Sequence, residues 1–434
     1  MIDFNRSREL QIKRANTDWW IHEKAIVGEN GKTYIVYCTD MGEIHIKELD
    51  AKCSKAPSRD FCLCRLNCSF ADEHNAPSLA ILSDGRLMVA YTGHGETHSV
   101  KYRVSERPYD ISSFGKEKTL PYRNHVTYAQ LSENAKKGEV WLFTRVGGTT
   151  WELRTSSDAG ESFGEPSVFL ASEAGGLFYF DVRHLLVPTA RGVEEQWFFA
   201  LYGHPTLSAD HTVRSGYFDA DGFLHRMNGE KTEINLYRGD KICLDALDTV
   251  YTAPEGTTVR LLAVAPTLPY RIGLAPFTPY KPETAYYLSA TFKMGEWRLS
   301  APIARAGEFL SSPGVEDGSQ TYLGGMAYYY GVGEAGLHPF HPHRYINTNR
   351  IYIARFDCSQ ALLESYVSGD EGESYAREQV IRRIPRDKSA VKIWRPTVPI
   401  HAQDNLPVYW HEGIYSAHTG GWHANAVMLV DYDD

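Results

Sequence analysis

Short apolar or alternating runs recur along the chain, and each is followed by Gly, Asp, Asn or Pro. The clearest runs are residues 33–38, 44–49, 78–82, 86–91, 140–145 and 196–202. Long helical periodicity is nearly absent. Short strands at close, regular spacing predict an all-β sandwich, barrel or propeller. Dividing 434 residues among seven blades gives about 62 residues per blade, which is near the repeat length of long-repeat propellers.

Two segments, residues 156–163 and 368–375, share the pattern Ser-x-Asp-x-Gly-x-Ser-aromatic. The pattern resembles the Asp-box of sialidase-like propellers. In such a turn the Asp bonds backbone amides, Gly permits a positive φ, and the aromatic residue packs under the next blade. These residues are therefore predicted to be structural. No low-complexity linker interrupts the chain, so we expect one domain over residues 1–434, an all-β seven-bladed β-propeller.

Composition and charge narrow the function classes. The 36 Gly, 27 Tyr, 18 Phe and 9 Trp suit tight turns and half-buried strands. The net charge of −9 argues against a general nucleic-acid binder. No run of about 18 apolar residues is present, which argues against a membrane span. The N-terminus lacks the apolar segment of a secretory signal, so the location stays open: secreted or periplasmic for a mature form, otherwise cytoplasmic.

Four of the seven cysteines, Cys53, Cys62, Cys64 and Cys68, lie within sixteen residues. Their gaps of eight, one and three residues match the ligand spacing of zinc sites poorly. Free thiols are therefore favoured, and a local disulfide and a metal site are the alternatives.

A second cluster places three histidines within six residues: His338, His341 and His343. Imidazole suits zinc and other transition metals, whereas the alternative is an exposed loop. The many loop carboxylates permit calcium, although no EF-hand spacing is present. A structural Ca²⁺ or Zn²⁺ ion is compatible with these loops, its ligands are unknown, and no organic cofactor is expected.

The most informative stretch, residues 72–94, is predicted to form a strand, an Asp-Gly hairpin and a second strand. His74 precedes the first strand and His94 follows the second. Because these ends of an antiparallel pair lie side by side, both imidazoles are expected at one end of one blade, within reach of a common ligand. The alternative is that each is an isolated loop histidine.

This stretch resembles the bacterial-neuraminidase-repeat (BNR) family of seven-bladed propellers, which includes polysaccharide lyases such as ulvan lyases and rhamnose–glucuronate lyases. Glu73 stands where that family is expected to have Asp, and the segment around Ile21 and His22 is altered, which leaves the exact substrate open. The resemblance covers most of the chain through these segments: 19–20, 23–25, 74–94, 126–128, 141–145, 202–205, 394–396 and 406–408.

The resemblance implies cleavage of the L-rhamnose-α-1,4-D-glucuronate linkage by β-elimination, giving a 4,5-unsaturated uronate. The uronate carboxylate must be neutralised so that enolate-like charge can develop. A base removes the C5 proton and an acid protonates O4. The C5 proton and O4 lie on the same face of the sugar ring, so one side chain could act first as the base and then as the acid. Tyrosine suits this role if nearby positive charge lowers its pKa from about 10.

By motif, Tyr128 is the candidate base and acid, and Arg145 is expected to hold the carboxylate. His94 would assist the neutralisation or lower the pKa of Tyr128. His74 would contact the carboxylate or act as the base itself. The alternatives are structural: Tyr128 would be an ordinary core aromatic residue, and Arg145 would be a solvated arginine at the end of a strand. The resemblance also implies three substrate-binding residues: Asn75, Arg183 and His204.

Two other functions remain open. One is an α-L-rhamnosidase-type glycoside hydrolase of the same propeller group, for which His22 is the alternative catalytic histidine. The other is a non-catalytic glycan-binding propeller. A sialidase is disfavoured because no Arg-Ile-Pro signature opens the chain. The expected partner is an anionic uronate-containing polysaccharide or oligosaccharide, with no nucleic acid, no membrane and a monomeric chain.

Overall fold

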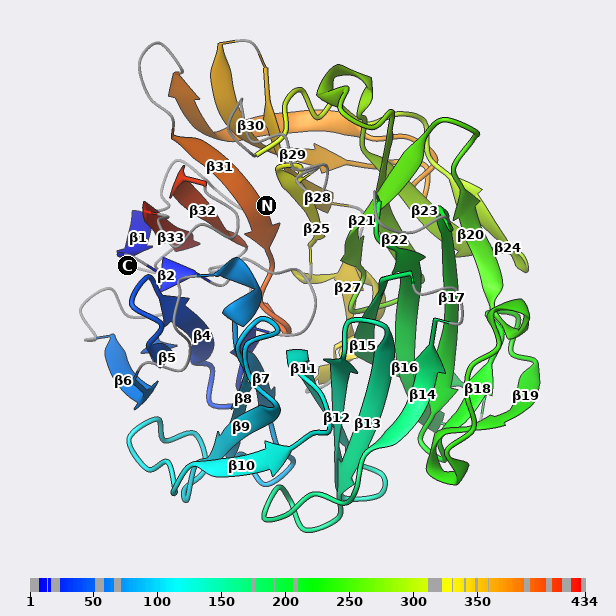
Figure 1. The fold of residues 1–434 in the computed structure, drawn as a ribbon. Helices are drawn as coiled ribbons and strands as arrows, with labels where there is room; N and C mark the ends of the chain where they lie inside the picture. The colour runs from blue at the N-terminus through cyan, green and yellow to red at the C-terminus, as the bar shows by residue number, and fades with distance from the viewer. Residues whose placement is uncertain are drawn as a thin grey trace.

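The strands of the protein, seen in a computed structural model, form sheets arranged around a common centre (Figure 1). Within the described residues, seven sheets have at least four strands each, and one hairpin stands apart. The expected all-β propeller is confirmed. The structure describes residues 8–13, 15–16, 24–50, 58–65, 72–172, 176–190, 192–205, 210–310, 322–329, 331–338, 341–347, 350–357, 359–385, 391–402, 408–415 and 423–430.

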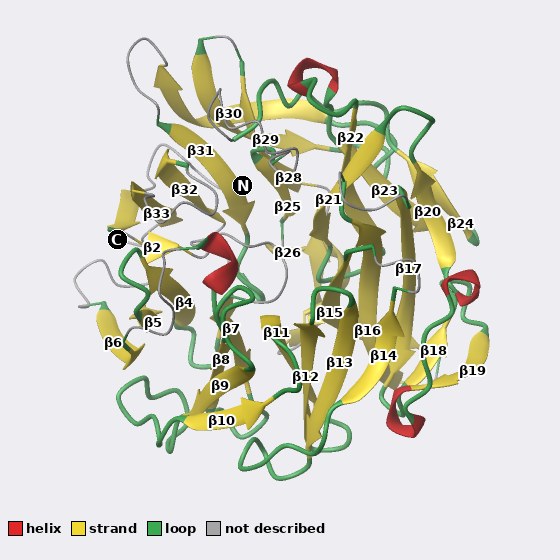
Figure 2. Cartoon of the chain, viewed as in Figure 1, coloured by secondary structure: helices red, strands yellow, loops and turns green. Residues whose placement is uncertain are grey.

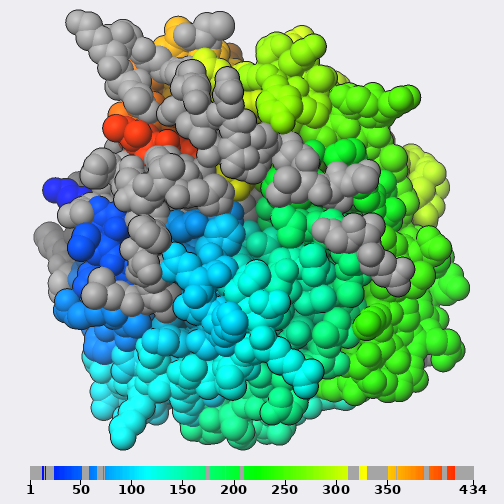
Figure 3. Space-filling model, viewed as in Figure 1, coloured from blue at the N-terminus to red at the C-terminus, as the bar shows by residue number. Residues whose placement is uncertain are grey.

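Most strands pair antiparallel with the next strand in sequence; the exceptions are the pairs β2–β4, β17–β20, β25–β28 and β1–β33. The sheets follow one another around the rim in chain order, as the colours show (Figure 3). The first sheet contains β2 (Ala15–Asn16), β3 (Ala25–Val27), β4 (Thr33–Thr39), β5 (Ile44–Leu49) and β6 (Arg59–Cys64). The second contains β7 (Ser78–Ile81), β8 (Leu87–Tyr91), β9 (Ser99–Val104) and β10 (Lys118–Pro121). The third contains β11 (Val126–Asn134), β12 (Glu139–Val146), β13 (Thr150–Ser156) and β14 (Ser167–Ala171).

The later sheets continue this arrangement. The fourth contains β15 (Phe178–Thr189), β16 (Gly192–Gly203), β17 (Thr212–Asp219), β18 (Phe223–His225), β19 (Lys231–Asn235) and β20 (Asp248–Thr252). The fifth contains β21 (Thr258–Val264), β22 (Arg271–Phe277), β23 (Leu288–Lys293) and β24 (Glu296–Leu299). The sixth contains β25 (Gly325–Tyr328), β28 (Arg350–Phe356), β29 (Gln360–Val367) and β30 (Ala376–Pro385), and the separate hairpin is β26 (Gly331–His338) with β27 (His341–Asn347).

The last sheet joins the two ends of the chain. Its strands are β31 (Lys392–Thr397), β32 (Val408–Ile414), β33 (His423–Val430) and β1 (Arg8–Ile12). The N-terminal strand β1 pairs with the C-terminal strand β33, so closure of the ring does not depend on side chains alone. Short 3-10 helices lie between strands (Figure 2): η1 (Glu73–Asn75), η2 (Leu236–Arg238), η3 (Leu244–Ala246) and η4 (Pro282–Thr284).

All six runs singled out in the sequence are strands, namely β4, β5, β7, β8, β12 and β16. The Asp-Gly turn between β7 and β8 is also confirmed, because Gly85 has φ +80°, which side chains with a Cβ rarely adopt. Large apolar side chains of consecutive sheets share one core, in which Trp141, Trp151 and Trp197 are buried. No helix among the described residues is long and apolar enough to cross a membrane.

The two Asp-boxes form the same turn. In the first, Asp158 accepts hydrogen bonds from the backbone and the hydroxyl of Ser162, at 2.8 and 2.6 Å. In the second, Asp370 accepts the equivalent bonds from Ser374, at 2.9 and 2.6 Å. The aromatic residue of the first box, Phe163, packs edge-on against Tyr102 of β9. The predicted Asp-box turn is therefore confirmed, whereas the prediction that its aromatic residue packs under the next blade is wrong, because Phe163 contacts the preceding sheet in chain order.

Candidate active site

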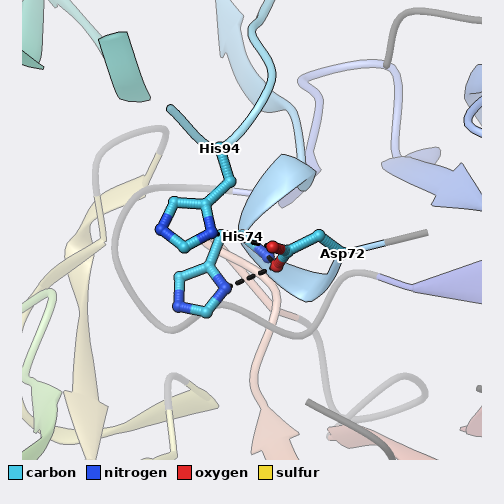
Figure 4. Close-up of side chains that lie close together, drawn as sticks. All are labelled: Asp72, His74 and His94. Atoms are coloured by element: carbon cyan, nitrogen blue, oxygen red, sulfur yellow. Dashed lines mark hydrogen bonds and ion pairs between the residues drawn. The ribbon is translucent and has the colours of Figure 1, made fainter. Parts of the chain in front are cut away.

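Asp72, His74 and His94 form a compact cluster at the start of β7 and the end of β8 (Figure 4). The Asp72 carboxylate contacts Nδ1 of His74 at 2.6 Å through Oδ1 and Nδ1 of His94 at 2.7 Å through Oδ2. The two imidazole rings stack with centroids 4.0 Å apart and planes 10° apart. The prediction that both histidines lie at the same end of one blade is therefore confirmed.

Local backbone structure fixes this cluster. Asp72 caps η1, because its side chain accepts a hydrogen bond from the backbone N–H of His74 at 2.9 Å. Asn75 is buried, and its side-chain carbonyl accepts a hydrogen bond from the backbone N–H of His94 at 2.7 Å. This bond ties the loop after β8 to η1. Asn75 therefore positions His94, whereas its predicted contact with substrate stays a prediction.

The donor atoms of Asp72, His74 and His94 lie within 4.8 Å of one another, as metal ligands do. The orientation of the rings does not suit a shared ion, however. A ligand nitrogen directs its lone pair in the plane of its ring, and two stacked, nearly parallel rings have no common plane in which one ion could lie. The arrangement instead suits proton binding, with one carboxylate accepting from two Nδ1–H groups.

Tyr128 lies in a bulge of β11, between Thr127 and Ala129, where the register with β12 shifts. Its φ of +62° is uncommon for a residue with a side chain and costs about 1–2 kcal/mol. The bulge turns the ring toward His74, with centroids 6.0 Å apart. Bulges are over-represented next to active sites, where they redirect a side chain. This geometry favours a functional role over that of an ordinary core aromatic.

Burial raises the pKa of the Tyr128 phenol well above its ordinary value, although the positive charge of Arg145 opposes this effect. The expectation that nearby positive charge leaves Tyr128 with a lowered pKa is therefore wrong for the protein without substrate. Desolvation of the phenolate outweighs one neighbouring guanidinium. The hydroxyl is accordingly protonated at neutral pH.

Arg145 is buried near the end of β12 rather than solvated. Its guanidinium carbon lies 4.6 Å from the ring centroid of Tyr128 and 5.4 Å from that of Tyr179. Its Nε and Nη1 atoms have no hydrogen-bond partner within the part of the chain that the structure describes. Because an uncompensated buried guanidinium is costly, this side chain is suited to receive an anion.

Of the other two predicted substrate-binding residues, one lies near this cluster and one farther along its strand. His204 follows β16, and its ring centroid is 5.7 Å from that of Tyr179. Arg183 is four residues after Tyr179 on β15, about 13 Å along an extended strand. It is paired with the fully buried Asp181 at 2.7 Å, which compensates its charge.

Several residues around the cluster were missed in the sequence. Tyr322 places its hydroxyl 3.4 Å from Nε2 of His74. The guanidinium carbons of Arg260 and Arg395 lie 4.6 and 5.9 Å from the Tyr322 ring centroid. Asp72 could have been predicted as part of the site, since it stands two residues before His74. Tyr322, Arg260 and Arg395 could not, because distant parts of the chain bring them to the cluster.

The structure describes only part of the predicted cysteine and histidine clusters. Within the described residues, Cys62 and Cys64 are free thiols, as the favoured reading expected, and burial raises the pKa of Cys64 to about 11. Cys53, Cys68 and His22 lie outside the described residues. The backbones of His338 and His341 pair in the β26–β27 hairpin, and the side chains of His338, His341 and His343 are not among those described.

A cavity of about 360 Å³ lies at the opposite ends of the inner strands. It is bordered by Ser83, which follows β7, and by Glu133, near the end of β11. None of the predicted site residues lines it. The candidate active site is therefore the cluster of His74, His94 and Tyr128 rather than this cavity.

Comparison with known proteins relates the chain to one group of propellers. Residues 32–158 match the model of the "BNR repeat-containing family member" group. The matched segment lies in the first three sheets of the propeller, so this part of the chain resembles the BNR-repeat group. A segment of 114 residues is 31% identical to an ulvan lyase of Pseudoalteromonas sp. (strain PLSV), and one of 115 residues is 30% identical to an ulvan lyase of Alteromonas sp. (strain LOR). Each alignment spans 23% of this chain and 23% of the relative.

Solved structures resemble this propeller over nearly its whole length. A PL25 ulvan lyase has a TM-score of 0.67 at 14% identity, with 98% of this chain and 96% of that chain covered. The same kind of enzyme bound to -[GlcA(1-4)Rha3S]- has a TM-score of 0.68. The polysaccharide lyase Uly1 has a TM-score of 0.53 at 11% identity. At such identities the likeness shows the fold, and the BNR-type resemblance expected from the sequence is confirmed.

Proposed function

We propose that this propeller is a polysaccharide lyase of BNR-repeat type that cleaves the L-rhamnose-α-1,4-D-glucuronate linkage of ulvan, gum arabic or a similar glycan by β-elimination. The observation that carries the proposal is the convergence of two imidazoles, a buried phenol and a buried guanidinium at one end of the inner strands. The partial identity to ulvan lyases supports it. We also propose that the seven sheets are the seven blades.

Arg145 is proposed to bind the uronate carboxylate. Its guanidinium can donate two parallel hydrogen bonds to a carboxylate, and its Nε and Nη1 lack partners among the described residues. Neutralising the carboxylate makes the C5 proton more acidic, because negative charge develops beside it as that proton leaves. The surrounding Tyr128 and Tyr179 rings exclude water and strengthen this interaction.

Tyr128 is proposed to protonate the leaving O4, because its raised pKa keeps a proton on the hydroxyl before substrate binds. One imidazole then removes the C5 proton. His94 suits that role better than His74, since the His94 side chain is 25% exposed and that of His74 is 2% exposed. In the alternative, Tyr128 alone acts as both base and acid. His204 and Asn75 are proposed to line the same site, and the substrate is an anionic glycan bound by a monomer.

A substrate screen tests the proposal. Incubation with ulvan, gum arabic and gellan is expected to produce the ultraviolet absorbance of a conjugated 4,5-unsaturated uronate from at least one of them. A rhamnosidase-type hydrolase would release reducing sugar without that absorbance, and a binding module would do neither. Reducing sugar without absorbance from every active substrate would refute the lyase.

A further inference from the structure

The Asp72 carboxylate uses a different oxygen for each of two stacked imidazoles (Figure 4). A carboxylate is only an acceptor. Both contacts at 2.6 and 2.7 Å therefore require a proton on Nδ1 of His74 and on Nδ1 of His94. In a neutral imidazole with Nδ1 protonated, Nε2 is the unprotonated, basic nitrogen.

We propose that Asp72 is a positioning residue that holds both His74 and His94 in the Nδ1–H tautomer, so that both basic Nε2 atoms face away from the carboxylate and toward the reacting sugar. Figure 4 shows the two outer nitrogens on the side of the rings opposite Asp72. The consequence for catalysis rests on the proposed lyase function, whereas the tautomers themselves do not.

The surroundings of the pair agree with this assignment. Nε2 of His74 lies 3.4 Å from the Tyr322 hydroxyl, which can donate to an unprotonated nitrogen. The centroid of the Tyr128 ring lies 6.0 Å from that of the His74 ring, and the Arg145 guanidinium stacks on the Tyr128 ring. Among these neighbours Asp72 is the anion. It therefore also stabilises a positive charge on either ring after that ring accepts a proton.

Asp72→Asn separates this role from simple support of the loop. An amide accepts through its oxygen but donates through its nitrogen, so only one histidine can keep its Nδ1–H contact. The other must present an unprotonated Nδ1 and move its proton to Nε2, which removes one base. In the Ser-His-Asp triad the same change costs about 10⁴-fold in kcat, and here we expect a loss of at least about 10²-fold with a smaller change in KM.

Loss of the Asp72 charge also makes the imidazolium forms less favourable. The acidic limb of kcat/KM is therefore expected to move to lower pH in Asp72→Asn, a change that mere loosening of the loop would not cause. The matched control is Asp60→Asn. Asp60 contacts Nδ1 of His45 at 2.7 Å on the outer strands of the first sheet, and this variant should keep the wild-type pH profile.

Nitrogen-15 spectra of labelled histidines provide the closing experiment without any substrate. The expected result is Nδ1–H for His74 and His94 in the wild type, with at least one of them switched to Nε2–H in Asp72→Asn and neither changed in Asp60→Asn. An Nε2–H form at either site in the wild type would overturn the proposal. Unchanged tautomers together with an unchanged acidic limb in Asp72→Asn would also do so. Failure to find any lyase product would leave the tautomer result standing and count against the proposed function alone.

Discussion

Two buried arginines on adjacent strands of the third sheet allow a sharp test of the carboxylate-binding role. Arg145 on β12 stacks on Tyr128 at 4.6 Å, and Arg154 on β13 stacks on Tyr122 at 4.7 Å. They differ in their hydrogen bonds. Nη1 and Nη2 of Arg154 donate to the backbone carbonyls of Gly164 and Pro121 at 2.6 and 2.5 Å, whereas Nε and Nη1 of Arg145 have no partner within the described ranges.

Arg145→Met should reduce activity far more than stability. Hydrogen bonds to charged groups contribute about 1.5–3 kcal/mol each, so loss of a bidentate pair with the uronate costs about 3–6 kcal/mol. At about 1.4 kcal/mol per tenfold change, kcat/KM should fall by about 10²–10⁴-fold. The free energy of unfolding should change little, because the lost ring contacts, worth about 0.5–2 kcal/mol, are offset by removal of a buried cation.

Arg154→Met should have the opposite effect. It leaves two backbone carbonyls without their donors, which costs about 3–6 kcal/mol of folding free energy by the same scale, while kcat/KM measured well below the melting temperature stays near the wild-type value. The assays are initial rates of ultraviolet absorbance on the active glycan and urea unfolding. A folded Arg145→Met variant within tenfold of wild-type kcat/KM would refute the carboxylate-binding role. Equal losses of activity in both variants would show a general effect of disturbing this sheet.

Three further changes have defined outcomes. Tyr128→Phe should lower kcat by at least about 10²-fold, as loss of a general acid does, and near-normal turnover in the absorbance assay would remove Tyr128 from the mechanism. Burial, together with the charges of Lys24 and Arg395, lowers the pKa of His411 to about 3. Because a histidine in the unfolded chain titrates at about 6.5, the contribution of neutral His411 to the free energy of unfolding is complete above that pH and is lost as the pH falls toward 3. His411→Gln should flatten this part of the urea-unfolding profile, and an unchanged slope would contradict the cause given. Asp158→Ala should lower the melting temperature without changing kcat, and an altered kcat would argue against a purely structural Asp-box.

The strands and the histidine pair were predictable because both depend on local sequence. Alternation and turn residues set β7 and β8, and the two strands bring His74 and His94 together through one hairpin. Tyr322 was not predictable in this way, since its contact with His74 spans 248 residues and forms only when the ring of blades closes.

The conformation and the proton affinity of Tyr128 illustrate the same limit. Residues 126–130 contain no Gly or Asn that would signal a left-handed conformation, and yet Tyr128 has a positive φ in the folded sheet. The sequence suggested the nearby positive charge of Arg145 but not the extent of burial. Burial decides the direction of the pKa shift, which is why the role proposed for Tyr128 is that of a protonated acid rather than a phenolate base.

The net charge of −9 does not determine the field at this site. Interactions between exposed charges weaken beyond about 8–10 Å at ordinary ionic strength, whereas Arg145, Arg260 and Arg395 are buried within contact distance of the aromatic rings around the cluster. In low dielectric each such cation acts strongly over a few ångströms. A local group of buried cations in an acidic protein is therefore compatible with the proposed binding of one uronate.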